Sequence, residues 1–196
     1  MSSVICFLKL IRLKNLIIVT VTQLLIKFCL INPFVDNFIL SNTEFYLLVL
    51  ATVLITAAGY IINDIYDVVT DTINKNQKRI IGKIIKSRTA LFWYILFNLI
   101  ALLLACYIAY IVTKPVFGLI FLYCIFSLWI YSKHMKGSFL LGNIQVSFLT
   151  ALSVFNVALF DLIPNGINKN NGELIIFKII LCYTAFAFIT TFIREI

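Results

Sequence analysis

Three aspartates at helical spacing are the residues of this chain whose types and positions most clearly suggest chemistry. Asp64, Asp67 and Asp71 stand at i, i+3 and i+7, which on an α-helix places their carboxylates within about 60° of one another on one face. Like charges so close repel, by roughly 1–4 kcal/mol per close pair at a protein surface. A bound cation would relieve this repulsion. The alternative interpretation is a solvated helix end just outside a membrane.

The chain around this acidic patch is strongly apolar. Its 196 residues are 62% hydrophobic, with a mean hydropathy of +1.06, whereas soluble domains are about 45–50% apolar. The composition therefore predicts an all-α integral membrane protein, with a single transmembrane domain over residues 1–196. The formal net charge of +8 does not indicate a nucleic-acid partner, because the cations lie between apolar segments, as membrane topology requires.

Six apolar segments approach the roughly 20 residues that a membrane-spanning helix needs: 11–31, 45–62, 90–112, 116–131, 139–163 and 174–193. With a cytoplasmic N-terminus, twelve cations fall on the inner side: Lys9, Arg12, Lys14, Lys75, Lys78, Arg79, Lys83, Lys86, Arg88, Lys133, Lys136 and Arg194. Four fall outside: Lys27, Lys114, Lys169 and Lys178. This bias predicts a multi-pass protein of the inner (cytoplasmic) membrane, with its N-terminus and acidic patch in the cytoplasm.

That topology places the start of the acidic patch at the edge of the apolar zone. Carboxylates there are costly and usually face a cavity. Oxygen ligands without nearby His or Cys favour Mg²⁺, which commonly completes its coordination with phosphate oxygens. We therefore expect Asp64, Asp67 and Asp71 to bind Mg²⁺ and, with it, a diphosphate.

Cationic and amide side chains near the same membrane face could bind the anionic head group of that ligand. They are Lys75 and Arg79 after the acidic patch, Lys133 and Lys136 in the next cytoplasmic loop, and Arg12 and Asn15 in the first segment. Topology and attraction to anionic membrane lipids are the alternative explanation of the cations.

The run from Asn63 to Lys75, N-D-I-Y-D-V-V-T-D-T-I-N-K, resembles the first signature of the UbiA superfamily of intramembrane prenyltransferases, N-D-x-x-D-x-x-x-D. The R-L-K-N start at residues 12–15 is similar to the family's polar opening. Residues 131–143, from Y-S-K-H-M-K to L-G-N, resemble its Y-[ST]-x-x-L-K segment. The likeness covers the whole chain. Within the superfamily, the chain most resembles the bacterial branch of geranylgeranylglycerol-phosphate geranylgeranyltransferases.

The resemblance implies a helical bundle around a central cavity, with Mg²⁺ and a prenyl diphosphate bound by two Asp-rich motifs. It implies transfer of the prenyl group to a lipid or aromatic acceptor, either geranylgeranylglyceryl phosphate or a quinone precursor. Asp64 and Asp67 would be catalytic, and Asn63 would orient the site or the acceptor. The chain would hold six of nine expected helices, the N-terminal two-thirds of the domain, and its final R-E-I resembles the opening of the second motif. We therefore expect a C-terminally truncated product, with a non-catalytic fragment or subunit of the same family as the alternative.

Two rival classes fit the sequence less well. Phosphatidyl-alcohol transferases also present Asp clusters to Mg²⁺ and a diphosphate, but their signature places D-G-x-x-A-R after the first D-x-x-D, whereas Val68 follows Asp67 here. A transporter is not favoured, because the sequence shows neither an intramembrane charge relay nor paired broken helices.

Overall fold

The computed structural model describes residues 3–35, 39–68, 80–136, 138, 140–164, 166–167 and 172–195. Within these residues, six helical stretches are long and apolar enough to cross a membrane. They are Leu13–Ile31, Asn42–Tyr66, Ser87–Ile111, Pro115–Met135, Leu141–Asp161 and Glu173–Glu195. The prediction of an all-α membrane protein with six spans is confirmed, and the expected boundaries differ from these by only a few residues.

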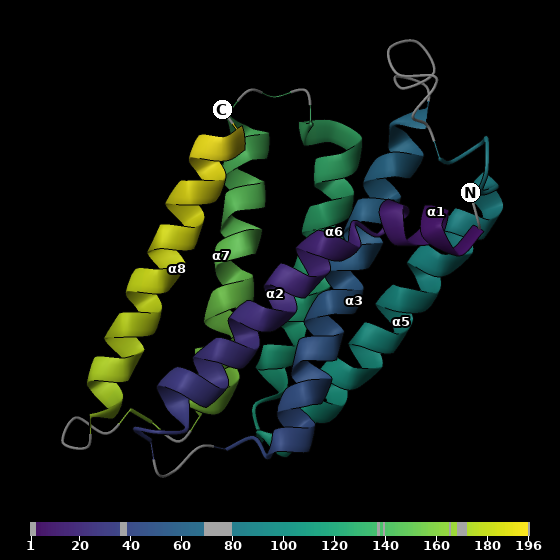
Figure 1. Ribbon diagram of the computed structural model, residues 1–196. Coiled ribbons are helices and arrows are strands. Elements are labelled where there is room, and N and C mark those ends of the chain that lie inside the picture. Colours follow the sequence, from purple (N-terminus) through teal and green to yellow (C-terminus); the bar gives the residue numbers. More distant parts are fainter. Residues whose placement is uncertain are drawn as a thin grey trace.

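The spans form a bundle in which α2 crosses obliquely between two groups of helices (Figure 1). α3 packs along α5, α7 packs along α8, and α2 contacts both α3 and α7. The elements in order are α1 (Ser3–Leu10), α2 (Leu13–Leu25), the π-helical η1 (Ile26–Ile31), α3 (Asn42–Tyr66), α5 (Ser87–Ile111), the 3-10 turn η2 (Pro115–Phe117), α6 (Gly118–Ile130), the π-helical η3 (Tyr131–Met135), α7 (Leu141–Asp161) and α8 (Glu173–Glu195).

Helix α3 is the central element of the bundle. Its most apolar stretch is 61% buried, against 17–39% for the other spans. A reciprocal capping box begins the helix, because Ser41 Oγ accepts from Glu44 N at 3.4 Å and Glu44 Oε2 accepts from Ser41 N at 2.7 Å. At Gly59 a Cβ atom would lie 2.9 Å from Leu128 Cδ1. The missing side chain therefore lets α6 approach α3 closely, as small residues do between membrane helices.

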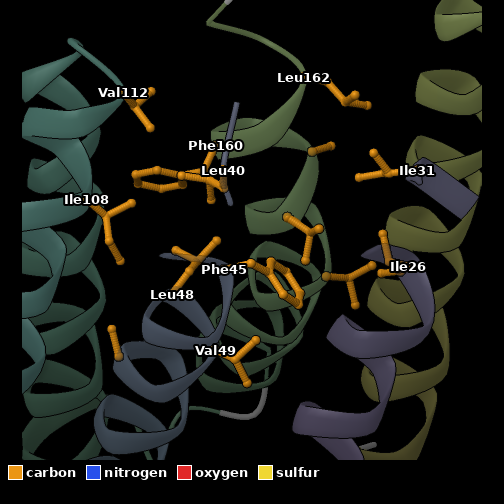
Figure 2. Close-up of a cluster of buried hydrophobic side chains, with 14 of the residues drawn as sticks. Ile26, Ile31, Leu40, Phe45, Leu48, Val49, Ile108, Val112, Phe160 and Leu162 are labelled. Carbon is orange, nitrogen blue, oxygen red and sulfur yellow. The ribbon is translucent and has the colours of Figure 1, made fainter. Parts of the chain in front are cut away.

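The larger apolar core joins α3, α5, α6, α7 and η1 near the end of the bundle where α3 begins (Figure 2). Phe45, Leu48 and Phe160 are fully buried there. A second buried cluster, which includes Leu10, Leu16 and Ile61, packs α1 and α2 against α3 nearer its C-terminal end. Many large apolar side chains elsewhere are exposed on the outside of the bundle. That distribution suits a chain whose outer surface contacts lipid.

The first span begins at Leu13, two residues after the expected start at residue 11. A turn at Ile11 and Arg12 separates the short helix α1 from α2. Arg12 adopts the left-handed conformation, with φ 52° and ψ 56°. A non-glycine residue rarely adopts this backbone conformation, and such residues are concentrated at functional sites. Hydropathy could not reveal the break, because both helices are apolar.

Candidate active site

A cavity of about 460 Å³ lies between α2, α3, α6, α7 and α8. Its middle is apolar, and its lining there includes Ile18, Ile55, Gly59, Phe121, Leu128, Val146 and Leu149. The end near the C-terminus of α3 is polar and charged. We call this end the mouth, and its residues are Arg12, Asn15, Tyr60, Asn63, Tyr131, Lys136, Arg194 and Glu195. The arrangement places a charged entrance on an apolar chamber.

Asp64 and Asp67 adjoin the mouth at the C-terminal end of α3. Asp67 N donates to Asn63 O at 3.0 Å, so the helical register continues through Asp67 although the helix formally ends at Tyr66. A helix C-terminus carries a partial negative charge, which disfavours carboxylates at that position. Nearby cations therefore stabilise these two side chains.

The mouth supplies those cations from the turn before α2 and from the residue after η3. Arg12 Nη2 lies 3.6 Å from Asp64 Oδ1, and Lys136 Nζ forms an ion pair with Asp67 Oδ2. The four side chains are 18–47% exposed. Partly solvated pairs of this kind contribute little to stability. A bound ligand of suitable charge could therefore replace them at small cost.

Tyr60 contacts two predicted binding residues, Asn15 on α2 and Arg12 in the turn before it. Asn15 Nδ2 donates to Tyr60 Oη at 3.0 Å, and the guanidinium carbon of Arg12 lies 4.6 Å from the centre of the Tyr60 ring. Sequence reasoning missed Tyr60. Its spacing gave a signal, because Tyr60 precedes Asp64 by four residues and so shares its helix face.

Part of the predicted metal site lies within the described residues. Asp71, the third predicted metal ligand, lies outside the described residues, as do Lys75 and Arg79, which were predicted to bind the anionic head group. Among the described residues, no group of three or more His, Cys, Asp or Glu side chains is placed to hold a metal ion.

The donors that are described nevertheless suit Mg²⁺. Asn63 Nδ2 donates to Asp67 Oδ2 at 3.2 Å, while the buried Asn63 Oδ1 has no hydrogen-bond partner in the described part of the chain. Two carboxylates and an orphaned amide oxygen form an all-oxygen donor set, which is the kind that Mg²⁺ prefers.

The remaining predicted residues divide into two groups. Arg12, Asn15 and Lys136 line the cavity, as expected of ligand-binding residues. Lys133 does not line it; its Nζ lies 4.9 Å from the centre of the Trp129 ring. The predicted residues that line the mouth therefore come from the start of α2 and its preceding turn, from α3, and from the segment after η3.

Three further residues of the mouth were not among the predicted site residues. Tyr131 belongs to η3, and Arg194 and Glu195 come from the end of α8. Asn143 Nδ2 donates to Glu195 O at 2.8 Å, which ties the beginning of α7 to the end of α8. The closing R-E pair thus reaches the same cavity as the first acidic motif.

The UbiA prenyltransferase family model matches residues 28–194. The chain belongs to this family. That membership agrees with the helical bundle, the internal cavity and the acidic pair at its mouth. The resemblance stated from the N-D-x-x-D run is confirmed.

The chain is similar to curated relatives named digeranylgeranylglyceryl phosphate synthase. The protein from Saccharolobus solfataricus is 34% identical over 147 residues, which cover 73% of this chain and 45% of the relative. The one from Methanosarcina barkeri is 37% identical over 118 residues, covering 59% and 39%. The chain thus spans about half the length, or less, of these relatives. No solved structure gives a significant match.

Proposed function

We propose that the protein transfers a prenyl group from a prenyl diphosphate to a lipid acceptor inside the membrane. The supporting observation is the cavity, because Arg12 and Lys136 line the mouth of an apolar chamber and pair there with Asp64 and Asp67. A prenyl diphosphate has the same two parts, a highly charged head and an apolar chain. The names of the similar relatives favour geranylgeranylglyceryl phosphate as the acceptor over a quinone precursor.

Asp64 and Asp67, with Asn63 Oδ1, would hold Mg²⁺, and Asp71 is proposed as a further ligand. When bound, Mg²⁺ supplies positive charge that favours departure of the diphosphate. Arg12 and Lys136 would turn from their carboxylate partners toward the diphosphate oxygens, and Lys75, Arg79 and Lys133 are proposed as additional contacts. Cationic groups arranged in advance at the position where negative charge develops are an effective form of catalysis.

The apolar chamber would protect the reacting carbon. As the allylic C–O bond breaks, diphosphate leaves with the bonding electrons and positive charge develops on the prenyl carbon. The acceptor hydroxyl oxygen then forms the new C–O bond and releases its proton to water at the mouth. Side chains such as Leu128 and Val146 keep other water from the carbon, so that transfer competes successfully with hydrolysis.

The direct test is a transfer assay in membranes that contain the protein. Geranylgeranyl diphosphate and geranylgeranylglyceryl phosphate are supplied with Mg²⁺ or with a chelator, and the ether-linked product is measured by mass spectrometry. We expect Asp67→Ala to lower the rate by at least about tenfold, because a metal ligand is lost. Chelation should abolish transfer.

Glu44→Gln is the matched control, because Glu44 is an acid in the first turn of the same helix, at the end far from the mouth. It should retain the rate. A rate for Asp67→Ala within about twofold of the unsubstituted protein would refute the metal role. Transfer to an aromatic quinone precursor alone would refute the lipid acceptor, and no transfer to either acceptor would favour a non-catalytic member of the family.

A further inference from the structure

A second polar group lies deep in the cavity, far from the mouth. We call Gln23, Thr52, Ser153 and Asn156 the deep polar cluster. Thr52 precedes Asn63 by eleven residues on α3, which corresponds to about 16 Å along the helix axis. Thr52, Ser153 and Asn156 line the cavity. Gln23 and Asn156 are only 1% and 4% exposed.

The hydrogen bonds of Thr52 decide how the two amide side chains are oriented. Thr52 Oγ1 donates its proton to Leu48 O at 3.0 Å, so it can only accept from other groups. It accepts from Gln23 Nε2 at 3.4 Å and from Asn156 Nδ2 at 3.3 Å. Gln23 Nε2 also donates to Ser153 O at 2.8 Å. Both amides must therefore direct their NH₂ groups into the cluster.

This orientation leaves the amide oxygens unused. Gln23 Oε1 and Asn156 Oδ1 are buried, and neither has a hydrogen-bond partner among the described residues. A buried acceptor without a partner is costly. Because Asn156 lines the cavity, a group that enters from the mouth could reach its oxygen. The unused capacity is for accepting hydrogen bonds only, so that group must be a donor.

We propose that Asn156 Oδ1 binds an O–H group at the deep end of the cavity, either the hydroxyl of a ligand whose phosphate is held at the mouth or a water molecule. The inference rests on the proposed function in one respect, the phosphate at the mouth. It adds a specificity determinant to that function. A wholly apolar chain long enough to reach Asn156 displaces the O–H donor without replacing its hydrogen bond, so the cluster limits the length of apolar chain that binds well.

The test uses n-alkyl phosphates of increasing length, each with and without a hydroxyl on its far end. Their binding to the purified protein in lipid nanodiscs with Mg²⁺ is measured by calorimetry. If the site accepts a ligand hydroxyl, the hydroxylated probe of matching length binds about tenfold more tightly than the plain one. If it holds water, no hydroxyl preference appears. Plain chains then lose about tenfold in affinity once they reach the cluster.

Either effect should disappear in Asn156→Leu, which keeps the approximate size of the side chain but removes its oxygen. Thr150→Val is the matched control, because Thr150 lines the same cavity but donates its hydroxyl proton to Val146 O on its own helix. It should retain the effect. Thr52→Val is the second variant if Asn156→Leu does not fold, because loss of the shared acceptor removes the constraint on the Asn156 amide and should also weaken the effect.

The outcomes separate the two proposals. The deep site would be overturned if affinity depended on chain length and on the hydroxyl in the same way in the unsubstituted protein and in Asn156→Leu. If Lys136→Ala still weakened binding in that case, the phosphate site at the mouth would stand. Failure of every probe to bind the unsubstituted protein would overturn both the phosphate site at the mouth and the deep site that depends on it.

Discussion

At the residue scale, Gly142 shows how closely the mouth is packed. A Cβ atom at this position would lie 2.7 Å from Met135 O and 3.3 Å from Tyr131 Cε2. Met135 ends η3, and Gly142 lies in the first turn of α7. The absence of a side chain therefore sets how closely the segment that carries Lys136 approaches α7.

We predict that Gly142→Ala destabilises the protein by about 1–3 kcal/mol, because the backbone carbonyl of Met135 must move to make room for the methyl group. It should also weaken phosphate binding, since Lys136 follows directly after Met135. Thermal unfolding of the purified protein measures the first effect, and the alkyl phosphate titration measures the second.

Gly118→Ala provides the comparison. A Cβ atom there would meet only Ala109 Cβ, at the ordinary contact distance of 3.7 Å. Alanine favours helices over glycine by about 1 kcal/mol, so this variant should be neutral or more stable. Equal losses of stability in the two variants would contradict the steric argument.

At the element scale, a buried ion pair fastens the end of the first span to α7. Lys27 in η1 pairs with Asp161 Oδ2, and both side chains are fully buried. Asp161 Oδ1 accepts from Leu40 N at 3.0 Å, and Lys27 Nζ donates to Leu40 O at 3.2 Å. The pair therefore holds together η1, α7 and the segment before α3. Topology alone suggested an outer-side cation for Lys27, whereas the structure gives it a buried partner.

We predict that Lys27→Met lowers the free energy of unfolding by about 3–5 kcal/mol, because it leaves the buried Asp161 carboxylate without its counter-charge. Adding Asp161→Asn should restore part of the loss, since a neutral amide oxygen can still accept from the backbone. Denaturant unfolding in detergent measures both variants. Lys114 is exposed, so Lys114→Met is the control. A similarly small loss of unfolding free energy in Lys27→Met and Lys114→Met would contradict a stabilising role of the buried ion pair.

At the scale of the whole molecule, helix α5 links two exposed loops that should lie on opposite sides of the membrane. Its 25 residues extend about 37 Å, longer than a hydrocarbon core of about 30 Å. Lys83 precedes the helix, Lys114 follows it, and both are exposed. The distribution of cations predicts that Lys83 and the mouth face the cytoplasm and that Lys114 lies outside.

We predict that a membrane-impermeant maleimide labels Lys114→Cys but not Lys83→Cys in intact spheroplasts. The substitutions are made in a protein whose five native cysteines have been replaced. Permeabilisation should expose both positions. The reverse pattern in intact cells would invert the orientation and place the mouth outside, against the predicted cytoplasmic position of the acidic patch.

The sequence alone was sufficient for the six spans and for the shared helix face of Asp64 and Asp67. Spans can be recognised from composition because a bilayer forces each segment to satisfy its own backbone hydrogen bonds, so a long apolar run has few alternatives to a helix. Asp64 and Asp67 share a face because the period of one helix fixes their spacing. Both results depend only on local rules.

The partners of those residues were decided by tertiary structure. Arg12 pairs with Asp64, and Lys136 pairs with Asp67, although the partners are far apart in the sequence. Gln23 reaches Ser153 across 130 positions of sequence. In a membrane both the lipid-facing and the helix-facing sides of a span are apolar, so hydropathy does not show how each helix is rotated against its neighbours. Close packing at Gly59 and Gly142 brings α3 and α7 near their neighbours at the middle and the mouth of the cavity.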